Sequence, residues 1–503
     1  MRKSVVCWRR AAGSLEALEK GIFVNRFSCA TRSVTFAAIV GLSLGLGGAP
    51  AVVAQDILIA APVKANIDFE RKGSLTLYKK SGAESGEHAT GHLMENVPGK
   101  PLNGVKFKAT KINVDLKTDD WAKFPKNAED AKNKLTTVTY EQTTTGEGVA
   151  KFGDLPLGLY LVEETEAPEG VVKGAPFIVS IPMVSAASNS WNYEIVAYPK
   201  NSETKVEKSV KDADKNIQDL YLYTITADAP NFKDPKKLTK FIFSDKLDDR
   251  LENPKATEVK AGDVTLAEGD FTESFVDGLY KVEISEKGLL KVASGVKVSL
   301  TFNVARKEVG NSVELVNSAD VIFNNPNTEE DITQKTNEVK TYHGKLKIVK
   351  KDAKEIDKVL EGATFELYRC EDPDTLKSKI SINGQSAWTT GKDGTVTIDG
   401  LHVTDVEDND KFIEKKYCLK ETAAPAGYSL MEKPVAFTMT RDELAQVAEG
   451  DDAVTLVKKV ENVKHDTPNL PMTGGAGIGI LAALGALIIG AGAWLARRNS
   501  AKN

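Results

Sequence analysis

The stretch GKLKIVKK, from Gly344 to Lys351, alternates apolar and polar side chains. A period of two residues is that of a β-strand with one buried face, so Leu346, Ile348 and Lys350 are expected on the same inward face. Short runs of this kind recur along the chain between turns rich in Gly, Asn, Asp and Pro, and long amphipathic helices are scarce. This pattern is typical of antiparallel β-sandwiches and predicts an all-β protein.

An earlier part of the chain repeats the motifs that follow this stretch. The shared order of the motifs indicates one domain type used twice. The residues between the copies keep strand-like runs without these motifs, which predicts a second sandwich type. We therefore expect three tandem immunoglobulin-like β-sandwich domains, residues 55–200, 201–342 and 343–468, in an elongated rod. The matching pairs are GSLTLYKK (Gly73–Lys80) with GKLKIVKK (Gly344–Lys351), PLNGVKFKA (Pro101–Ala109) with VLEGATFEL (Val359–Leu367), TTGEGVAKFGDL (Thr144–Leu155) with TTGKDGTVTIDGL (Thr389–Leu401), and YLVEETEAPEG (Tyr160–Gly170) with YCLKETAAPAG (Tyr417–Gly427).

The start of the chain predicts export. A long basic beginning is followed by the apolar run VTFAAIVGLSLGLG, Val34 to Gly47, and then by the small residues Val52 and Ala54. This is the organisation of a secretory signal peptide, which predicts that residues 1–54 are removed. A permanent N-terminal anchor is the alternative, but spanning a bilayer needs about 20 apolar residues, so the anchor is less favoured.

The end of the chain predicts attachment. The motif LPMTG is followed by a charge-free apolar segment, residues 475–496, long enough to span a bilayer, and then by a short basic tail that favours the cytoplasmic side. This order, within residues 469–503, resembles the cell-wall sorting signal of Gram-positive surface proteins. The resemblance implies that a sortase cysteine attacks the carbonyl of Thr473, releases the chain from Gly474 onward and passes the protein to an amine. The motif residues are Leu470, Pro471, Met472, Thr473 and Gly474.

The composition argues against several other classes of protein. The formal net charge is −5 and no basic block is concentrated enough to predict nucleic-acid binding. The histidines fall where loops or strand edges are expected, with no zinc spacing and no nucleophile elbow, so no metal, cofactor or enzymatic activity is predicted. Two of the four cysteines lie in the leader; the other two, Cys370 and Cys418, can form a disulfide outside the cell. Two buried free thiols are the alternative.

The third domain places polar residues on a face expected to be buried. Lys350 lies on the inward face of the first strand, Asn462 lies near the end of the last strand, and Glu421 lies in YCLKETAAPAGY. This motif resembles the E-box of collagen-adhesin B-type (CnaB) domains. The resemblance implies that the Lys350 amine attacks the Asn462 carboxamide while Glu421 shuttles protons, so that ammonia leaves and an isopeptide bond forms. Burial suits this chemistry because it disfavours the charged amine. A buried Lys–Glu pair without a bond is the alternative.

The first domain matches this arrangement position by position. The repeat aligns Lys79 with the lysine, Glu164 with the glutamate and Asn201 with the asparagine. Its E-box is less complete, because EETEAP has acidic neighbours and continues as EGVV where the third-domain motif continues as AGYS. The resemblance implies the same bond here, with an unbonded first domain as the alternative.

The middle domain resembles A-type (CnaA) collagen-adhesin domains. In that family a lysine lies in the first strand, an aspartate in a middle strand and an asparagine in the last strand. The residues that fit are Lys208, Asp245 and Asn317. Lys208 is preferred to Lys205 because it shares the two-residue parity of its apolar neighbours.

The stretch WNYEIVAYPKN, Trp191 to Asn201, resembles the pilin motif of shaft pilins of the SpaA type. Ile195 and Ala197 stand where the family has valines. The resemblance implies that Lys200 is the amine that resolves the sortase thioester, joining one subunit to Thr473 of the next. The proline supports this role because it suits a strand end and restricts the backbone beside the lysine.

These features together predict the backbone subunit of a covalent pilus anchored to the cell wall and located outside the cell. The implied partners are identical subunits, a pilus-specific class C sortase, a housekeeping sortase, minor tip and basal pilins, and peptidoglycan; a host surface is a further candidate. One alternative is a monomeric, wall-anchored adhesin that binds host matrix; it shares every feature except the pilin motif, so Lys200 discriminates between the two. Another is a tip or basal minor pilin, which is expected to lack either that motif or the full three-domain pattern.

Overall fold

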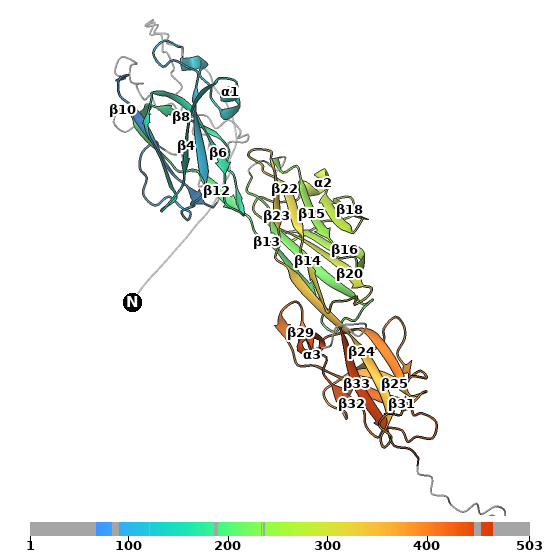
Figure 1. The fold of residues 1–503 in the computed structure, drawn as a ribbon. Helices are drawn as coiled ribbons and strands as arrows, with labels where there is room; N and C mark the ends of the chain where they lie inside the picture. Colours follow the sequence, from blue (N-terminus) through green and yellow to red (C-terminus); the bar gives the residue numbers. More distant parts are fainter. Residues whose placement is uncertain are drawn as a thin grey trace, which may run out of the picture.

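The chain forms a rod of three β-sandwich domains, ordered along the sequence from the blue end to the orange end (Figure 1). This computed structural model confirms the predicted all-β, tandem architecture. No helix in the described part of the chain is long and apolar enough to cross a membrane. The expected signal peptide and the LPMTG sorting signal lie outside the described residues and stay predictions. The structure describes residues 67–82, 90–119, 121–185, 190–232, 234, 237–446 and 454–465.

The first domain packs a three-stranded sheet, ordered β11-β1-β5, against a four-stranded sheet, ordered β4-β3-β6-β8. Alternation along β1 turns Leu75 and Leu77 inward, where both are fully buried with Phe107 from the facing sheet. The domain also contains two short sheets, ordered β2-β12-β7 and β10-β9. The elements are β1 (Gly73–Tyr78), β2 (Lys80–Ser81), β3 (Lys106–Ile112), η2 (Trp121–Lys123), α1 (Ala128–Lys132), β4 (Leu135–Thr143), β5 (Val149–Leu155), β6 (Gly158–Glu166), β7 (Val171–Val172), β8 (Phe177–Ile181), β9 (Met183–Ser185), β10 (Ser190–Asn192), β11 (Glu194–Ala197) and β12 (Lys200–Glu203).

The middle domain consists of two five-stranded sheets, ordered β13-β14-β20-β16-β17 and β18-β19-β15-β22-β23. Its core is aromatic: Tyr223, Phe302 and Phe243 are buried between the sheets. The elements are β13 (Val206–Lys211), β14 (Leu220–Asp228), β15 (Phe241–Lys246), β16 (Leu251–Ala261), β17 (Val264–Thr265), β18 (Phe271–Val276), β19 (Leu279–Ile284), α2 (Glu286–Leu289), β20 (Lys297–Arg306), β21 (Glu314–Asn317), β22 (Asp320–Asn324) and β23 (Asp331–Lys335).

The third domain repeats the plan of the first. Its first strand β24 pairs in parallel with its last strand β33, as β1 pairs in parallel with β11 in the first domain. The facing sheet contains β26, β25, β31 and β32. The elements are β24 (Val339–Asp352), β25 (Thr364–Cys370), β26 (Leu376–Lys379), β27 (Trp388–Thr389), β28 (Thr395–His402), β29 (Val406–Glu407), β30 (Lys411–Phe412), β31 (Lys416–Ala423), β32 (Val435–Phe437), α3 (Arg441–Ala445) and β33 (Thr455–Asn462).

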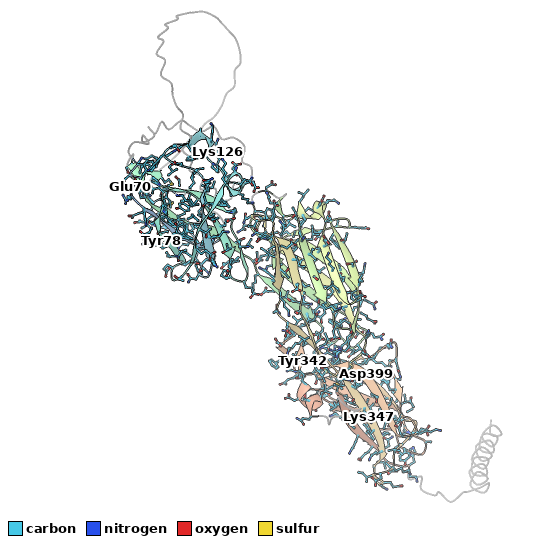
Figure 2. The ribbon with its side chains drawn as sticks, turned by 45° about the horizontal axis from the view of Figure 1, so that its top comes forward. Glu70, Tyr78, Lys126, Tyr342, Lys347 and Asp399 are labelled. Atoms are coloured by element: carbon cyan, nitrogen blue, oxygen red, sulfur yellow. A yellow bond between two sulfur atoms is a disulfide. The ribbon has the colours of Figure 1, made fainter. Side chains whose placement is uncertain are left out.

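Strands run through both expected domain boundaries. β12 contains Lys200 and continues to Glu203, and β24 continues across residue 342. The start of β24 pairs with β21 of the middle domain, whereas the rest pairs with β28 and β33 of the third domain. β24 is therefore hydrogen-bonded into sheets of both the middle and the third domain. This sharing restricts the orientation of one domain relative to the other. Figure 2 shows Tyr342, which lies on this shared strand, between the two domains.

Two histidines at this junction are core residues, which corrects the expectation of loops or edges. His343 and His402 are both buried, and their ring centroids lie 5.4 Å apart. Burial, together with the nearby charge of Arg306, holds the pKa of His343 well below its ordinary 6.5. The neutral ring accepts from Arg306 Nη1 at Nδ1, 3.2 Å away, and donates from Nε2 to Lys215 O at 2.9 Å. The expectation failed for His343 because β24 continues through a position where the sequence suggested a domain boundary. It failed for His402 because this residue ends β28 and pairs with His343 on β24.

Candidate functional site

The third domain brings a lysine, an asparagine and a glutamate together between its two sheets. Lys350 on β24 donates from Nζ to Oδ1 of Asn462, the last residue of β33. Asn462 Nδ2 donates to Glu421 on β31, at 3.0 Å from each carboxylate oxygen. Lys350 Nζ lies 3.3 Å from Glu421 Oε1. The amine is therefore held against the carboxamide, with a carboxylate bridging the amine and the amide nitrogen.

The surroundings of this triad favour an uncharged amine. The Lys350 side chain is fully buried, and its Nζ lies 5.6 Å from the centre of the Phe365 ring. Desolvation lowers the pKa of Lys350 below its ordinary 10.5, although the neighbouring Glu421 opposes that shift. A lysine amine is nucleophilic only when it has lost its proton, so burial prepares Lys350 to attack a neighbouring carbonyl carbon.

The first domain builds the same cluster. Lys79, directly after β1, donates to Glu164 on β6 and to Asn201 Oδ1 on β12, the latter at 2.5 Å. Asn201 Nδ2 donates to Glu164 Oε2 at 2.6 Å. Lys79 is fully buried, and desolvation lowers its pKa. The lysine stands over Phe107, 5.7 Å from the ring centre, as Lys350 stands over Phe365 in the third domain.

The middle domain has an aspartate in place of the glutamate. Lys208 on β13 donates to Asp245 Oδ2 on β15, and Asn317 Nδ2 lies 3.5 Å from the same oxygen. All three residues are buried, and Lys208 Nζ lies 4.6 Å from the Tyr223 ring centre. Desolvation lowers the pKa of Lys208 and raises the pKa of Asp245, so burial favours the neutral forms of both partners.

Two details of the middle domain concern the expected choice of its lysine and the expected position of its asparagine. Lys205 is an exposed residue that pairs with Glu207, so Lys208 is the lysine that lies at Asp245. Asn317 ends β21, and β22 and β23 follow it in the chain, so it does not lie on the last strand of the domain as the resemblance suggested. It faces the cluster because β21 pairs with the start of β24.

The stretch from Trp191 to Asn201 does not form one continuous strand. It divides into β10, β11 and β12, with Tyr193 between the first two strands and Tyr198-Pro199 between the last two. Proline lacks an N–H group, so it interrupts a ladder of backbone hydrogen bonds. Tyr198 stacks on Tyr78 at 5.4 Å, and its hydroxyl accepts from Met94 N at 2.7 Å, which anchors the chain just before Lys200.

Adjacent residues of β12 face opposite ways. Asn201 is buried in the cluster with Lys79, whereas Lys200 is partly exposed. Both are held by parallel pairing with β2, Lys200 opposite Lys80 and Asn201 opposite Ser81. Because side chains alternate along a strand, a single short strand presents one residue to the core and its neighbour to the surface.

Backbone N–H groups that sequence reasoning missed also contact the clusters. Met431 N donates to Glu421 Oε2 at 2.9 Å in the third domain, and Gly174 N donates to Glu164 Oε2 at 3.1 Å in the first. Each donor lies 10 residues after its glutamate. That equal spacing within the repeat is the signal that could have identified them.

Cys370 and Cys418 form the expected disulfide. Cys370, at the end of β25, is bonded to Cys418 on the neighbouring strand β31, with their Cα atoms 5.8 Å apart. Cys418 lies three positions before Glu421 on the same strand. The bond thus ties the glutamate-bearing strand to its neighbour.

Replacing both cysteines with serine is expected to lower the free energy of unfolding of the third domain by about 2–4 kcal/mol, mainly because the unfolded chain regains freedom. The closed loop spans 48 residues. Denaturation with and without the substitutions measures the effect. Thiol labelling of the unfolded, unreduced protein is the control: labelled Cys370 or Cys418 would instead support free thiols.

A row of sandwiches, each with a buried lysine, asparagine and carboxylate in one cluster, is the architecture of an extended structural protein. Residues 69–202 match the family described as Gram-positive pilin subunit D1, N-terminal domain, and residues 344–453 match the SpaA prealbumin-like fold domain.

Whole-chain comparisons agree. The chain is 31% identical to fimbrial subunit type 2 of Actinomyces naeslundii, covering 92% of this chain and 95% of the relative. It is 29% identical to fimbrial subunit type 1 of Actinomyces viscosus, covering 94% and 98%. The full-length major pilin SpaD of Corynebacterium diphtheriae matches its fold with a TM-score of 0.76 and 58% identity, over 80% of this chain and 100% of that structure. The chain belongs to the family of Gram-positive pilin subunits, as a major pilin of the SpaA type.

Proposed function

We propose that this chain is the repeating backbone subunit of a covalent, wall-anchored pilus. A class C sortase cleaves between Thr473 and Gly474 and holds Thr473 as a thioester. The amine of Lys200 from another subunit then attacks that thioester and forms an amide bond. Repetition of this head-to-tail step does not close on itself and therefore produces a filament.

The observation that carries this proposal is the placement of Lys200. The lysine is partly exposed at the end of a motif anchored by Tyr198, on a strand held on both sides by β2 and β7. A fixed backbone limits where the amine can reach, which is what transfer to one acceptor position requires.

The buried clusters support a second part of the proposal, in which each domain carries an internal cross-link. The lysine amine attacks the asparagine carboxamide carbon, the carboxyl group moves the proton to the leaving nitrogen, and ammonia departs. The pairs are Lys79–Asn201, Lys208–Asn317 and Lys350–Asn462, with Glu164, Asp245 and Glu421 as the respective acids. In the third domain the bond would join the first strand, β24, to the last strand, β33, so that tension between Lys200 and Thr473 bypasses the sandwich. The first domain precedes Lys200 and lies outside this line of force, so its bond would instead secure Asn201, the residue next to the linkage.

The setting of such a subunit is the cell surface. A housekeeping sortase would join the base of the fibre to peptidoglycan, and minor pilins would occupy the tip and the base. The fibre would be extracellular and could contact a host surface. The relatives are structural fimbrial subunits, and the internal cross-link forms once per domain without turnover.

A peptide map of fibres released from cell walls tests the proposal. We expect a branched peptide in which Thr473 is joined to Lys200. If Thr473 were joined only to wall peptide and Lys200 were unmodified, the result would contradict the proposed pilus and support the monomeric adhesin. The mass of the recombinant chain 55–473 tests the cross-links separately, because each bond removes one ammonia.

A further inference from the structure

The peptide group between Lys173 and Gly174 touches two domains at once. Its N–H, on Gly174, donates to Glu164 Oε2 in the first-domain cluster at 3.1 Å. Its carbonyl, on Lys173, accepts from two amide side chains of the middle domain, Asn325 Nδ2 at 3.0 Å and Asn327 Nδ2 at 3.1 Å. One rigid, planar unit thus connects the acid of the first domain to a loop of the second.

The middle-domain side of this contact is well ordered by its own hydrogen bonds. Asn325 is fully buried, its N–H donates to Glu330 O at 2.7 Å, and its Oδ1 accepts from Asn327 N at 2.9 Å. Around the peptide, Lys173 Nζ forms an ion pair of 2.5 Å with Glu330, and Val172 packs into the hydrophobic core of the middle domain. The loop that supplies the Gly174 N–H is therefore docked on the middle domain.

The first-domain side leaves little room for this loop to move. A Cβ on Gly174 would lie 2.9 Å from Asn201 Oδ1 and 3.1 Å from Glu164 Oε1, so the backbone approaches the reacting groups directly. Hydrogen bonds to a carbonyl also polarise the N–H of the same peptide and strengthen its donation. In the third domain the corresponding Met431 N–H contacts Glu421 within a single domain.

We infer that the middle domain positions the acid of the first domain. Asn325 and Asn327 hold the 173–174 peptide, whose N–H fixes Glu164 against Lys79 and Asn201. Formation of the Lys79–Asn201 bond consequently depends on docking of the middle domain, whereas formation of the Lys350–Asn462 bond does not. This inference rests on the proposed cross-link, and Asn325 and Asn327 are positioning residues.

The test follows the two bonds in the same molecules. The chain 55–473 is isolated in denaturant directly after synthesis, before the bonds have formed, and is then refolded and sampled over time. Branched peptides containing Lys79–Asn201 and Lys350–Asn462 are quantified by mass spectrometry. In the double variant Asn325→Ala/Asn327→Ala we expect the first bond to form about tenfold more slowly, on the order of the loss of one or two hydrogen bonds. The rate of the third-domain bond is expected to be unchanged.

Three further variants make the result specific. Asn327→Ala alone changes an exposed residue, so it keeps the test valid if the buried Asn325 is needed for folding. In this variant the formation of the Lys79–Asn201 bond is expected to slow by a smaller factor than in the double variant. Asn327→Gln retains an amide donor and is expected to restore most of the rate. Glu330→Gln removes the ion pair with Lys173 but leaves both donors, and is expected to have little effect.

Failure of the coupling between the domains can be distinguished from failure of the first-domain cross-link. An unchanged Lys79–Asn201 rate in the variants without donors would overturn the coupling and leave the cross-link itself intact. Equal slowing by Glu330→Gln would also overturn it, because general docking rather than the peptide group would then control the rate. Absence of the Lys79–Asn201 product even in the unaltered chain, with Lys350–Asn462 present, would overturn the first-domain cross-link and the inference together.

Discussion

Chains carrying Lys200→Arg are expected to be exported and folded but to leave no high-molecular-weight ladder on a denaturing gel. Arginine keeps the positive charge and nearly the length of lysine, but its guanidinium stays protonated and does not act as a nucleophile at physiological pH. The thioester at Thr473 would then have no acceptor on a neighbouring subunit. Co-expression with the pilus sortase, followed by gel analysis of wall extracts, measures the effect.

Lys205→Arg is the matched control for this prediction. Lys205 lies on the same connection between the first two domains, but its side chain is 68% exposed and pairs with Glu207. Ladders are expected to be normal in this variant. A normal ladder with Lys200→Arg would show that another lysine accepts Thr473 and would remove the central element of the proposed function.

The substitution Glu421→Gln is expected to prevent the third-domain cross-link while preserving the shape of the cluster. Glutamine occupies the same volume, but it cannot carry the proton between the amine and the leaving ammonia. Lys350 and Asn462 would remain as separate side chains, so the intact mass would retain the ammonia of this site.

The same variant is expected to lose stability. The cross-link joins residues 112 positions apart, and closing a loop of about 100 residues is worth about 4–5 kcal/mol in the chain-entropy account. Denaturant unfolding and trypsin resistance measure the loss. Glu432→Gln, an exposed change in the same domain, is the control and should leave both unaltered. A cross-link that still forms in Glu421→Gln would exclude this carboxylate as the required proton carrier.

Local periodicity in the sequence was enough to predict which lysines are buried. Leu346, Ile348 and Lys350 occupy alternate positions, and all three are fully buried. The same parity distinguished Lys208 from Lys205. Such predictions succeed because the direction of a side chain on a strand depends only on its position along that strand.

Local reasoning failed where a strand continues across an expected domain boundary. His343 was expected at a loop or a strand edge, but β24 passes through that position into the next sheet. The pairing partners of β24 decide this outcome, and a partner strand far away in the chain leaves no local signal.

The sequence by itself determined the all-β class, the repeated domain and the inward direction of the lysines, because each depends on short-range alternation or on self-similarity. Only the tertiary structure decided which groups meet. Lys350 reaches Asn462 because β24 and β33 pair in parallel, and the 173–174 peptide meets Asn325 because two domains dock there. Contacts across long sequence separations are set by sheet pairing and domain packing, which residue patterns within one strand do not contain.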